Sequence, residues 1–407
     1  MATKHILVVG GGFGGIKAAL DLAKNGHFTV TLLTEHDDFR YYPTLYRTAT
    51  GGSRANTAIP LSEIFKDLRI TIAIGTATEL DRKKKQIITA DGTVYEYDTL
   101  ILGLGVVTNY FSIPGLEEFA YGIKSNESAL KFKAHLHQQL VDDKQPDLNY
   151  LIVGGGPTGI ELAGALPSYL EHIMAKHGVK KRSVNIHLIE ASPRLLPRSP
   201  KRTSWAVRRR LKRLGIKVHL GKVVQGETAD ELTMSGRKLK SHTVVWTAGV
   251  TNHPFFSNNH FVLMNRGKVA TDVYLQAEPD IFVIGDNANT PYSGLAQTAV
   301  LDGTFVAENL KRQARGKDMR AYNPKAPTSV IPAGPHWAAV SYKNLTVNGW
   351  LGWVLREAAD FIAFKDLESW PKAARQWLTG FEEEEENCAF CAVGSSDATP
   401  DPAPERA

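Results

Sequence analysis

Cysteine is nearly absent from this chain of 407 residues. The two cysteines, Cys388 and Cys391, lie close together near the C-terminal end. So few cysteines exclude a disulfide framework, and their position excludes a redox-active cysteine pair in the rest of the chain. Their spacing is typical of zinc ligands, but a structural zinc needs four ligands and no second pair accompanies them. We therefore expect no metal site.

Long apolar runs are also missing. No stretch approaches the roughly 18 residues that a membrane-spanning helix requires, and the first apolar segment begins too close to Met1 for a signal peptide to precede it. These two features predict a cytoplasmic protein, or one bound peripherally to the inner face of the cell membrane. The length predicts two or three domains.

Acidic residues are few outside the last part of the chain. Residues 381–407 contain eight acidic residues and one arginine, whereas residues 1–380 contain 47 Lys and Arg against 34 Asp and Glu. The acidic tail is expected to be disordered. The basic body favours an anionic partner such as a membrane surface or nucleotides. No nucleic-acid-binding motif accompanies the charge, so nucleic acid is not expected as a partner.

Glycine is concentrated in two short motifs. Gly10–Gly15 follows the apolar run Ile6–Val9, and Gly154–Gly159 follows Leu151–Val153. Both motifs fit G-x-G-x-x-G between a buried strand and a helix. Glycine there permits a tight turn and lets the backbone approach a pyrophosphate, and the helix N-terminus offers free N–H groups to the phosphates.

Each glycine motif is followed by an acid at the end of a second apolar segment, Glu35 and Glu190. Such an acid accepts hydrogen bonds from ribose hydroxyls. Two nucleotide sites in one chain indicate two cofactors that exchange electrons. A carboxylate at Glu190 repels a 2′-phosphate, which favours NADH over NADPH. The nearby cations, which we interpret as a solvated face, are Arg194, Arg198, Lys201 and Arg202.

The order of the segments predicts an α/β fold with two doubly wound, Rossmann-like dinucleotide-binding domains, the second inserted in the first. Further strands are expected at 244–249 and, buried, at 97–105 and 280–286, with two short ones at 70–74 and 86–89. The predicted organisation has four parts: a discontinuous domain of residues 1–112 and 250–320, a second domain of residues 113–249, a C-terminal region of residues 321–380, and the tail of residues 381–407.

Aromatic residues gather in the C-terminal region. A stretch compatible with one amphipathic helix contains Trp350, Trp353, Val354, Phe361, Ile362 and Phe364. The spacing predicts a single apolar, aromatic-rich face, with the charged residues between its members. That face either packs on the protein or on a second subunit of a homodimer, or it lies at a membrane interface with its tryptophans at headgroup level.

The order of these motifs resembles that of the type II NADH:quinone oxidoreductases, which are single-subunit flavoenzymes of the membrane surface that do not pump protons. The resemblance covers about residues 4–315. Besides the two glycine motifs it rests on Phe39–Leu45, Gly159–Gly164, Trp246–Val250, Ile284–Asp286 and Ala296–Ala299. The chain departs from the family at Leu102–Gly105, where Ala-Thr-Gly or Ala-Leu-Gly is usual, and at Leu301, where a second glutamine is common.

The resemblance implies that the chain uses FAD and NADH and reduces a quinone. FAD would be held by Gly10, Gly12, Phe13, Gly14, Gly15, Glu35, Gly105, Asp286, Ala296 and Gln297. NADH would be held by Gly154, Gly156, Pro157, Thr158, Gly159, Glu190, Ala248 and Gly249. Glu161 would lie where the nicotinamide meets the flavin, and Gln297 would lie beside the isoalloxazine near the quinone.

Alternatives remain for these roles and for the function. Glu161 is either a proton relay or a residue that orients the nicotinamide or packs its helix, and Gln297 either serves the quinone or only contacts the flavin. The chain could instead be a soluble reductase that passes electrons to a small redox protein, or a flavin-bound protein that senses NADH. A sulfide:quinone oxidoreductase needs cysteines near the flavin, and none precedes Cys388.

Overall fold

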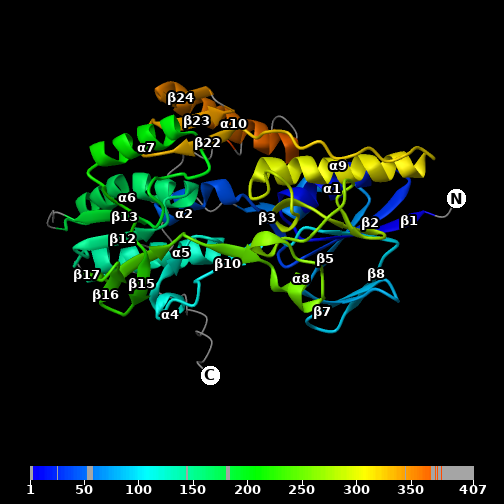
Figure 1. The fold of residues 1–407 in the computed structure, drawn as a ribbon, viewed down its shortest axis with the longest axis horizontal. Coiled ribbons are helices and arrows are strands. Elements are labelled where there is room, and N and C mark those ends of the chain that lie inside the picture. The colour runs from blue at the N-terminus through cyan, green and yellow to red at the C-terminus, as the bar shows by residue number, and fades with distance from the viewer. Residues whose placement is uncertain are drawn as a thin grey trace.

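The computed structural model describes residues 3–24, 26–52, 58–143, 145–179, 184–343 and 345–367, together with Lys372, Ala374 and Trp377. Figure 1 shows two α/β lobes side by side and a C-terminal element packed along one edge of the second lobe. The predicted disordered tail and both cysteines lie outside the described residues.

The first lobe is built on a six-stranded sheet with the order β20-β21-β9-β1-β2-β5. Five strands are parallel and β20 pairs antiparallel with β21. The strands are β1 (Lys4–Val9), β2 (Phe28–Thr34), β5 (Ile70–Ile74), β9 (Thr99–Leu102), β20 (Gln276–Glu278) and β21 (Ile281–Val283). The predicted strand at 70–74 is confirmed, and those at 97–105 and 280–286 are confirmed as shorter strands that lie inside the predicted ranges.

Helices and smaller strands surround this sheet. Helices α1 (Phe13–Ala23) and α9 (Ala296–Ala314) pack tightly against each other. The small antiparallel sheets contain β3 (Asp38–Arg40) with β4 (Ala58–Pro60), and β6 (Ala77–Asp81), β7 (Gln86–Thr89) and β8 (Val94–Glu96). The short helical segments of the lobe are η1 (Tyr42–Thr44), α2 (Leu45–Ala49), α3 (Leu61–Ile64), α8 (Pro254–Asn258), η4 (Asn265–Gly267) and η5 (Gly285–Asn287).

The second lobe repeats the plan around a five-stranded parallel sheet with the order β11-β18-β12-β13-β14. Its strands are β11 (Tyr121–Gly122), β12 (Asn149–Val153), β13 (Asn185–Glu190), β14 (Lys217–Leu220) and β18 (Thr243–Trp246). Its helices are α4 (Leu116–Phe119), α5 (Asn126–His137), η3 (Gln138–Asp142), α6 (Pro157–Lys176) and α7 (Lys201–Arg213). A meander flanks the sheet, formed by β15 (Val224–Glu227), β16 (Glu231–Met234) and β17 (Arg237–Lys240).

The chain passes between the lobes in two strands that pair with each other. These are β10 (Val106–Thr108), which leads into the second lobe, and β19 (Val250–Asn252), which returns from it. The second lobe is therefore an insertion between two parts of the first, as the segment order predicts. Because both crossings run through one antiparallel pair, the two lobes are joined by a short, hydrogen-bonded connection.

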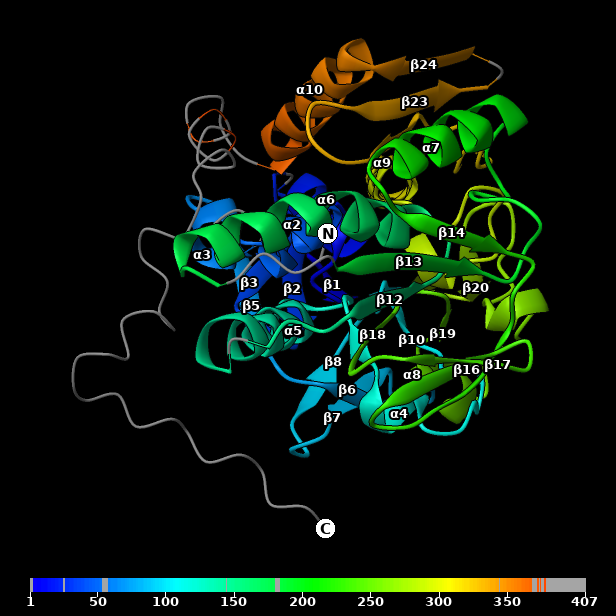
Figure 2. The ribbon, with the colours of Figure 1, turned by 90° about the vertical axis from the view of Figure 1, so that its left-hand side faces the viewer.

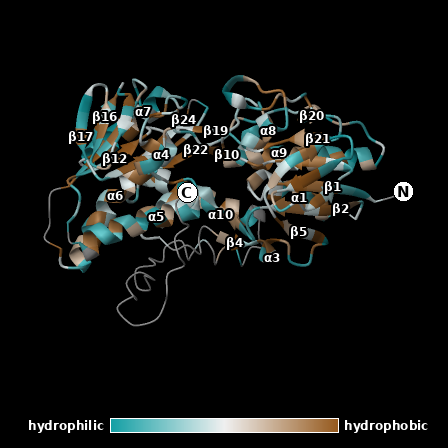
Figure 3. Ribbon diagram, turned by 90° about the horizontal axis from the view of Figure 1, so that it is seen from below, coloured by the Kyte–Doolittle hydropathy of each residue, from teal (hydrophilic) through white to brown (hydrophobic). Residues whose placement is uncertain are grey.

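The interior of each lobe is apolar. Strands β9 and β18 are buried along their whole length, as is typical of parallel sheets covered on both faces. Figure 3 shows the hydrophobic residues concentrated in the inner strands and in the facing sides of the helices, with hydrophilic residues outside. None of the described helices combines the length and the apolar character that crossing a bilayer would require.

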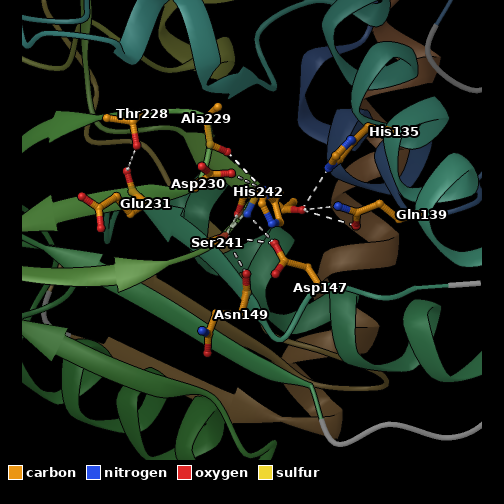
Figure 4. A network of polar contacts seen from close by, with 11 residues as sticks. His135, Gln139, Asp147, Asn149, Thr228, Ala229, Asp230, Glu231, Ser241 and His242 are labelled. Atoms are coloured by element: carbon orange, nitrogen blue, oxygen red, sulfur yellow. Dashed lines mark hydrogen bonds and ion pairs between the residues drawn. The ribbon is translucent and has the colours of Figure 1, made fainter. Parts of the chain in front are cut away.

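A polar network fixes the amino ends of the second sheet (Figure 4). The buried Asp147 carboxylate accepts from the backbone N–H of His242 at 2.7 Å and from the Ser241 hydroxyl at 3.2 Å. His135 of α5 shares a hydrogen bond of 2.9 Å with the hydroxyl of Thr243, at the start of β18. The network ties α5 to β18 and so sets the register of the strand whose other end lies beside the second glycine motif.

The C-terminal element is a three-stranded antiparallel sheet followed by a helix. It comprises β22 (Ser329–Pro332), β23 (Ala338–Tyr342), β24 (Leu345–Gly349) and α10 (Trp350–Leu367). The helix is present as predicted, but the prediction of a single apolar face between charged residues is wrong. Three of its charged residues, Arg356, Glu357 and Asp360, are buried, whereas Lys365 is exposed.

The exposed side of α10 is apolar instead. Trp350, Leu351, Val354, Leu355 and Ile362 are solvent-exposed. The remaining aromatics point inward: Phe364 is buried against Tyr41, and Phe361 contacts Trp377. The helix has this inverted arrangement because its charged residues find partners inside the protein, which periodicity in the sequence cannot reveal.

Candidate functional site

The two glycine motifs adopt the same backbone conformation. Gly10 and Gly154, each directly after a buried strand, have φ angles of +111° and +120°, a conformation that L side chains rarely adopt. A Cβ on Gly15 would lie 1.9 Å from the Gly10 carbonyl oxygen, and a Cβ on Gly159 would lie 2.0 Å from that of Gly154. In each turn the helix therefore lies so close to the end of the strand that any residue with a Cβ would clash at the last glycine.

The middle glycine of each motif leaves open space in front of a helix. Gly12 is the N-cap of α1 and Gly156 is the N-cap of α6, and both are extended, with φ −85° and −80°. A Cβ built on either residue meets nothing within 4 Å. The free N–H groups of each helix thus lie beside open space, which leaves room for a pyrophosphate. Pro157 occupies the first turn of α6, where its missing N–H costs nothing.

The first motif lies where two strands of the first sheet, β1 and β9, end beside α9. A Cβ on Gly10 would lie 2.2 Å from the carbonyl oxygen of Gly103, at the end of β9. A Cβ on Gly14 would lie 3.0 Å from the carbonyl oxygen of Ala299 in α9. The ends of β1 and β9 and the start of α9 therefore form one edge of the lobe, the place where open parallel sheets bind nucleotides.

Phe13 and Glu35 differ in how they lie at this edge. Phe13 is buried, with its ring 4.9 Å from that of Phe39 in an edge-on contact, so its side chain belongs to the core and its backbone to the turn. Glu35 follows β2 and is exposed. The predicted ribose ligand is therefore accessible from solvent.

Gly105 is tied to the far part of the lobe by a buried amide. The backbone N–H of Gly105 donates to Oδ1 of Asn287 at 2.8 Å, and Nδ2 of Asn287 donates to the Gly105 carbonyl. The same Nδ2 donates to Asn252 of the returning strand β19 at 2.6 Å. Asn287 was not predicted from the sequence, although it directly follows the predicted Asp286.

A buried carboxylate, that of Asp302, accepts a hydrogen bond from the turn that carries Asp286. Asp302 of α9 accepts from the Gly285 backbone N–H at 3.0 Å and from the hydroxyl of Tyr322. Burial raises the pKa of Asp302 to about 6, while the two hydrogen bonds oppose that rise. Lys268 supports the same turn by donating to the Asp286 carbonyl at 2.6 Å. Asp302 was not predicted from the sequence, where the available signal was an acid among the apolar residues of α9.

Ala296 and Gln297 begin α9 next to this edge. The Gln297 side chain is exposed, and its Oε1 accepts from the Thr328 backbone N–H at 3.0 Å. Gln297 therefore connects the start of α9 to the segment that leads into the C-terminal sheet. A residue that serves a quinone from this position would lie where the first lobe meets the C-terminal element.

In the second motif Glu190 already has backbone partners. Its carboxylate accepts from the Gly155 N–H and the Ser192 N–H, both at 2.6 Å. These bonds fix the carboxylate against the phosphate-binding turn, and the unused lone pairs of its two oxygens can accept from a ribose. An anionic group in this place disfavours a 2′-phosphate.

The basic residues after Glu190 do not form one cluster around it. Arg194 donates to the carbonyl oxygens of Leu196 at 3.2 Å, of Ser199 at 2.8 Å and of Pro197, so its guanidinium organises its own loop. Arg198, Lys201 and Arg202 are exposed, as expected for a solvated face.

Ala248 and Gly249 follow β18 beside the same turn. A Cβ on Gly154 would lie 2.9 Å from the Ala248 Cα. A Cβ on Gly249 would lie 2.4 Å from the ring of Phe111, which is itself exposed. The missing side chain of Gly249 therefore makes room for Phe111, and an exposed aromatic ring stands at the point where the chain crosses between the lobes.

Glu161 lies on α6, where the two lobes and the C-terminal element meet. It is partly buried. The charged groups that interact with its carboxyl group come from other elements: Arg47 from α2, and Arg356 and Asp360 from α10. Burial raises the pKa of Glu161 to about 7, a rise that the two arginines oppose and Asp360 reinforces. A carboxyl group with this pKa exchanges a proton readily near neutral pH.

A buried polar cluster fixes α10 next to Glu161. Tyr41 donates its hydroxyl hydrogen to Asp360 at 2.7 Å, and Arg356 pairs with the same carboxylate. Arg47 donates to Glu357 at 3.0 Å. The cluster was not predicted, because its partners are about 310 residues apart in the chain.

A family model described as pyridine nucleotide-disulphide oxidoreductase matches residues 4–303. The chain is 27% identical over 396 residues to a type II NADH:quinone oxidoreductase of Mycobacterium tuberculosis, with 89% of this chain and 85% of that protein covered. It is also 27% identical over 358 residues to a type II NADH:quinone oxidoreductase of Staphylococcus aureus, with 82% and 88% covered.

Solved structures support the fold. The chain is similar to the NDH2 of Plasmodium falciparum, solved in complex with NADH, with a TM-score of 0.83, 17% identity, and 95% and 99% of the two chains covered. It is also similar to the sulfide:quinone oxidoreductase of Aquifex aeolicus, with a TM-score of 0.74, 18% identity, and 88% and 89% covered. These likenesses confirm the predicted fold of two dinucleotide-binding lobes.

Proposed function

This chain belongs to the pyridine nucleotide-disulphide oxidoreductase family, and we propose that it is a type II NADH:quinone oxidoreductase that uses FAD, oxidises NADH and reduces a membrane quinone without pumping protons. The observation that carries the proposal is the pair of matching phosphate cradles at Gly12 and Gly156. The two relatives described above, which align with most of the chain, are named for this activity. No cysteine precedes Cys388, so residues 1–387 cannot pass electrons through a disulfide.

The residues of the first lobe bind and orient the flavin nucleotide. The N–H groups of the first turn of α1, behind Gly12, hold its pyrophosphate, and Glu35 accepts from its adenosine ribose. Asp286 accepts from its ribityl or phosphate region, on a turn kept rigid by Asp302. When bound, FAD supplies the redox chemistry, because it accepts a hydride from NADH and gives up two electrons to a quinone.

The residues of the second lobe bind and orient the pyridine nucleotide. The turn before α6 holds its pyrophosphate, and Glu190 accepts from its ribose while it stays bound to the turn. Glu190 selects NADH because a second negative charge on the ribose would meet a carboxylate that cannot move away. Holding both nucleotides in fixed positions supplies proximity and orientation, so no side-chain nucleophile is required.

Reduction of a quinone to a quinol adds two hydrogens, of which one enters with the hydride of NADH, and Glu161 is the residue we assign to deliver the other as a proton. Its pKa of about 7 leaves it partly protonated at neutral pH. It lies beside α10, which presents an apolar surface to solvent. Gln297, at the start of α9, orients the flavin or the quinone from the other side of the C-terminal element.

We place the enzyme peripherally on the inner face of the cell membrane. The exposed apolar residues of α10 support this placement, because such a stripe is costly in water and fits a lipid interface. The alternative is that a second copy of the chain covers these apolar residues. Liposome flotation tests the membrane, and sedimentation of the free protein tests the dimer. A protein that floats equally well without residues 345–380 would rule out the role of the helix.

A steady-state assay tests the function itself. The FAD-loaded protein is supplied with NADH or NADPH and with a soluble quinone, oxygen or ferricyanide. We expect rapid NADH oxidation with the quinone and much slower oxidation of NADPH. Turnover with ferricyanide alone would contradict the proposed quinone reaction.

A further inference from the structure

Three long segments of the chain contain no Asp or Glu: residues 191–226, 232–271 and 319–356. Residues 191–226 are the most basic of them, with eleven Lys and Arg. This segment contains α7, and residues 319–356 contain the C-terminal sheet and the start of α10.

These two acid-free segments pack against each other. Arg210 of α7 donates to the carbonyl oxygens of Ala333 at 3.0 Å and Pro335 at 2.9 Å. The hydroxyls of Thr203 and Thr346 lie 3.3 Å apart. Figures 1 and 2 both show α7 lying alongside β23 and β24 on the same edge of the molecule. The two segments therefore form one surface, which we call the α7–hairpin face.

Six cations of this face are solvent-exposed. The exposed ones on α7 are Lys201, Arg202, Arg208, Arg209, Lys212 and Arg213. Within the part of the chain that the structure describes, none of the six pairs with a carboxylate. One of them, Arg209, stacks over the ring of Trp205 at 5.3 Å. A row of like charges held on one helix repels itself, and a bound anionic surface would relieve that repulsion.

Large apolar side chains are exposed on the same elements, α7, the hairpin and the start of α10. Trp205 on α7 is 63% exposed, Leu345 at the hairpin is 74% exposed, and Trp350 at the start of α10 is 66% exposed. Tyr342 and Leu351 are exposed beside them. Arginine and lysine next to tryptophan and leucine is the composition of a surface that rests in a lipid headgroup layer.

We infer that the α7–hairpin face docks on an anionic phospholipid surface, with the cations of α7 on the headgroups and the hairpin and Trp350 in the acyl boundary. The inference rests on the proposed function, since the quinone lies in a membrane. It assigns the electrostatic half of docking to a helix of the NADH-binding lobe rather than to the C-terminal helix. An acidic protein or a nucleic acid would match the cations but not the exposed Leu345 and Trp350.

A vesicle-binding experiment on the full-length, FAD-loaded protein tests the assignment. The α7 variant carries R208Q, R209Q, K212Q and R213Q. Its control carries K83Q, K131Q, R237Q and K240Q, four exposed cations on other elements. Vesicles consist of phosphatidylcholine alone or of an equal mixture with phosphatidylglycerol. Activity with a water-soluble quinone is measured in parallel without lipid.

The α7 variant is expected to bind the mixed vesicles at least about 100-fold more weakly at low salt, since each basic residue near an anionic surface contributes about fivefold. Wild-type binding should also weaken as salt is raised, because screening shortens to about 3 Å at 1 M. The control should bind like wild type. A double variant, L345S with W350S, should lose binding to both kinds of vesicle, and all variants should keep the soluble-quinone activity.

Two results would overturn the inference. One is equal binding by the α7 variant and wild type, and the other is an equal loss in the control. Absence of soluble-quinone activity in wild type would instead count against the proposed function, whatever the vesicles show.

Discussion

Substituting Gly159 with alanine should disable one nucleotide site and spare the other. Gly159 closes the second turn, and its built Cβ lies 2.0 Å from the Gly154 carbonyl oxygen and 2.8 Å from the Thr247 hydroxyl. Neither neighbour is the flexible end of a long side chain. The turn must therefore open by about 1 Å to reach an acceptable contact, which moves the N–H groups of α6 away from the phosphates.

The size of the effect follows from those N–H groups. Each hydrogen bond to a charged phosphate contributes about 1.5–3 kcal/mol, so misaligning two of them costs roughly 3–6 kcal/mol. Because 1.4 kcal/mol corresponds to a factor of ten, NADH affinity should fall by at least about 100-fold. FAD is held by the first lobe, and its occupancy should not change.

The assay is a titration of NADH against the FAD-loaded protein under anaerobic conditions, with FAD content measured separately. G15A is the mirror variant, since its Cβ would lie 1.9 Å from the Gly10 carbonyl, and it should lose FAD. G226A is the control, because its Cβ has only an ordinary contact of 3.6 Å to Pro114. Unchanged NADH affinity in G159A, or loss of FAD as well, would refute the assignment of the two turns.

Three further predictions concern single carboxylates. Since the pKa of Glu161 is raised to about 7, quinone turnover should fall as pH rises through 7, and E161Q should turn over slowly with no such pH step. The native state also keeps a proton on Glu161 that the unfolded chain loses. The free energy of unfolding of wild type should therefore fall between about pH 4.5 and 7, and that of E161Q should not show this fall. D302A leaves the Gly285 N–H buried without an acceptor, so it should cost about 1–3 kcal/mol in thermal unfolding and release FAD on dilution, and full FAD retention would contradict its supporting role. E190A frees the Gly155 N–H and should reduce the preference for NADH over NADPH in kcat/KM, whereas an unchanged ratio would remove Glu190 from selectivity.

The nucleotide turns were predictable because they are local. A buried strand, a run of glycines and a helix follow one another within residues 4–23 and again within residues 149–176, and the positive φ of Gly10 and Gly154 requires that residue type. The parallel sheets followed from the repetition of this unit with crossover helices. The same locality explains why the strand at 70–74 was located to the residue.

The supporting residues were not predictable because their partners are distant in the chain. Asn287 reaches Gly105 across 182 residues, and Tyr41 reaches Asp360 across 319. The inverted face of α10 has the same origin, since the buried Asp360 and Arg356 have Tyr41 and the Pro43 carbonyl as distant partners. A helical pattern fixes which residues share a face, but the tertiary contacts decide which face is buried.

The most direct test of the central claim is an anaerobic pair of half-reactions followed through the flavin absorbance. NADH should bleach the bound flavin with one equivalent per FAD, and a soluble quinone should then restore the oxidised spectrum, with NADPH far slower in the first step. A purified protein that binds no flavin, or whose flavin is bleached by NADH and then left reduced by quinone, would contradict the account.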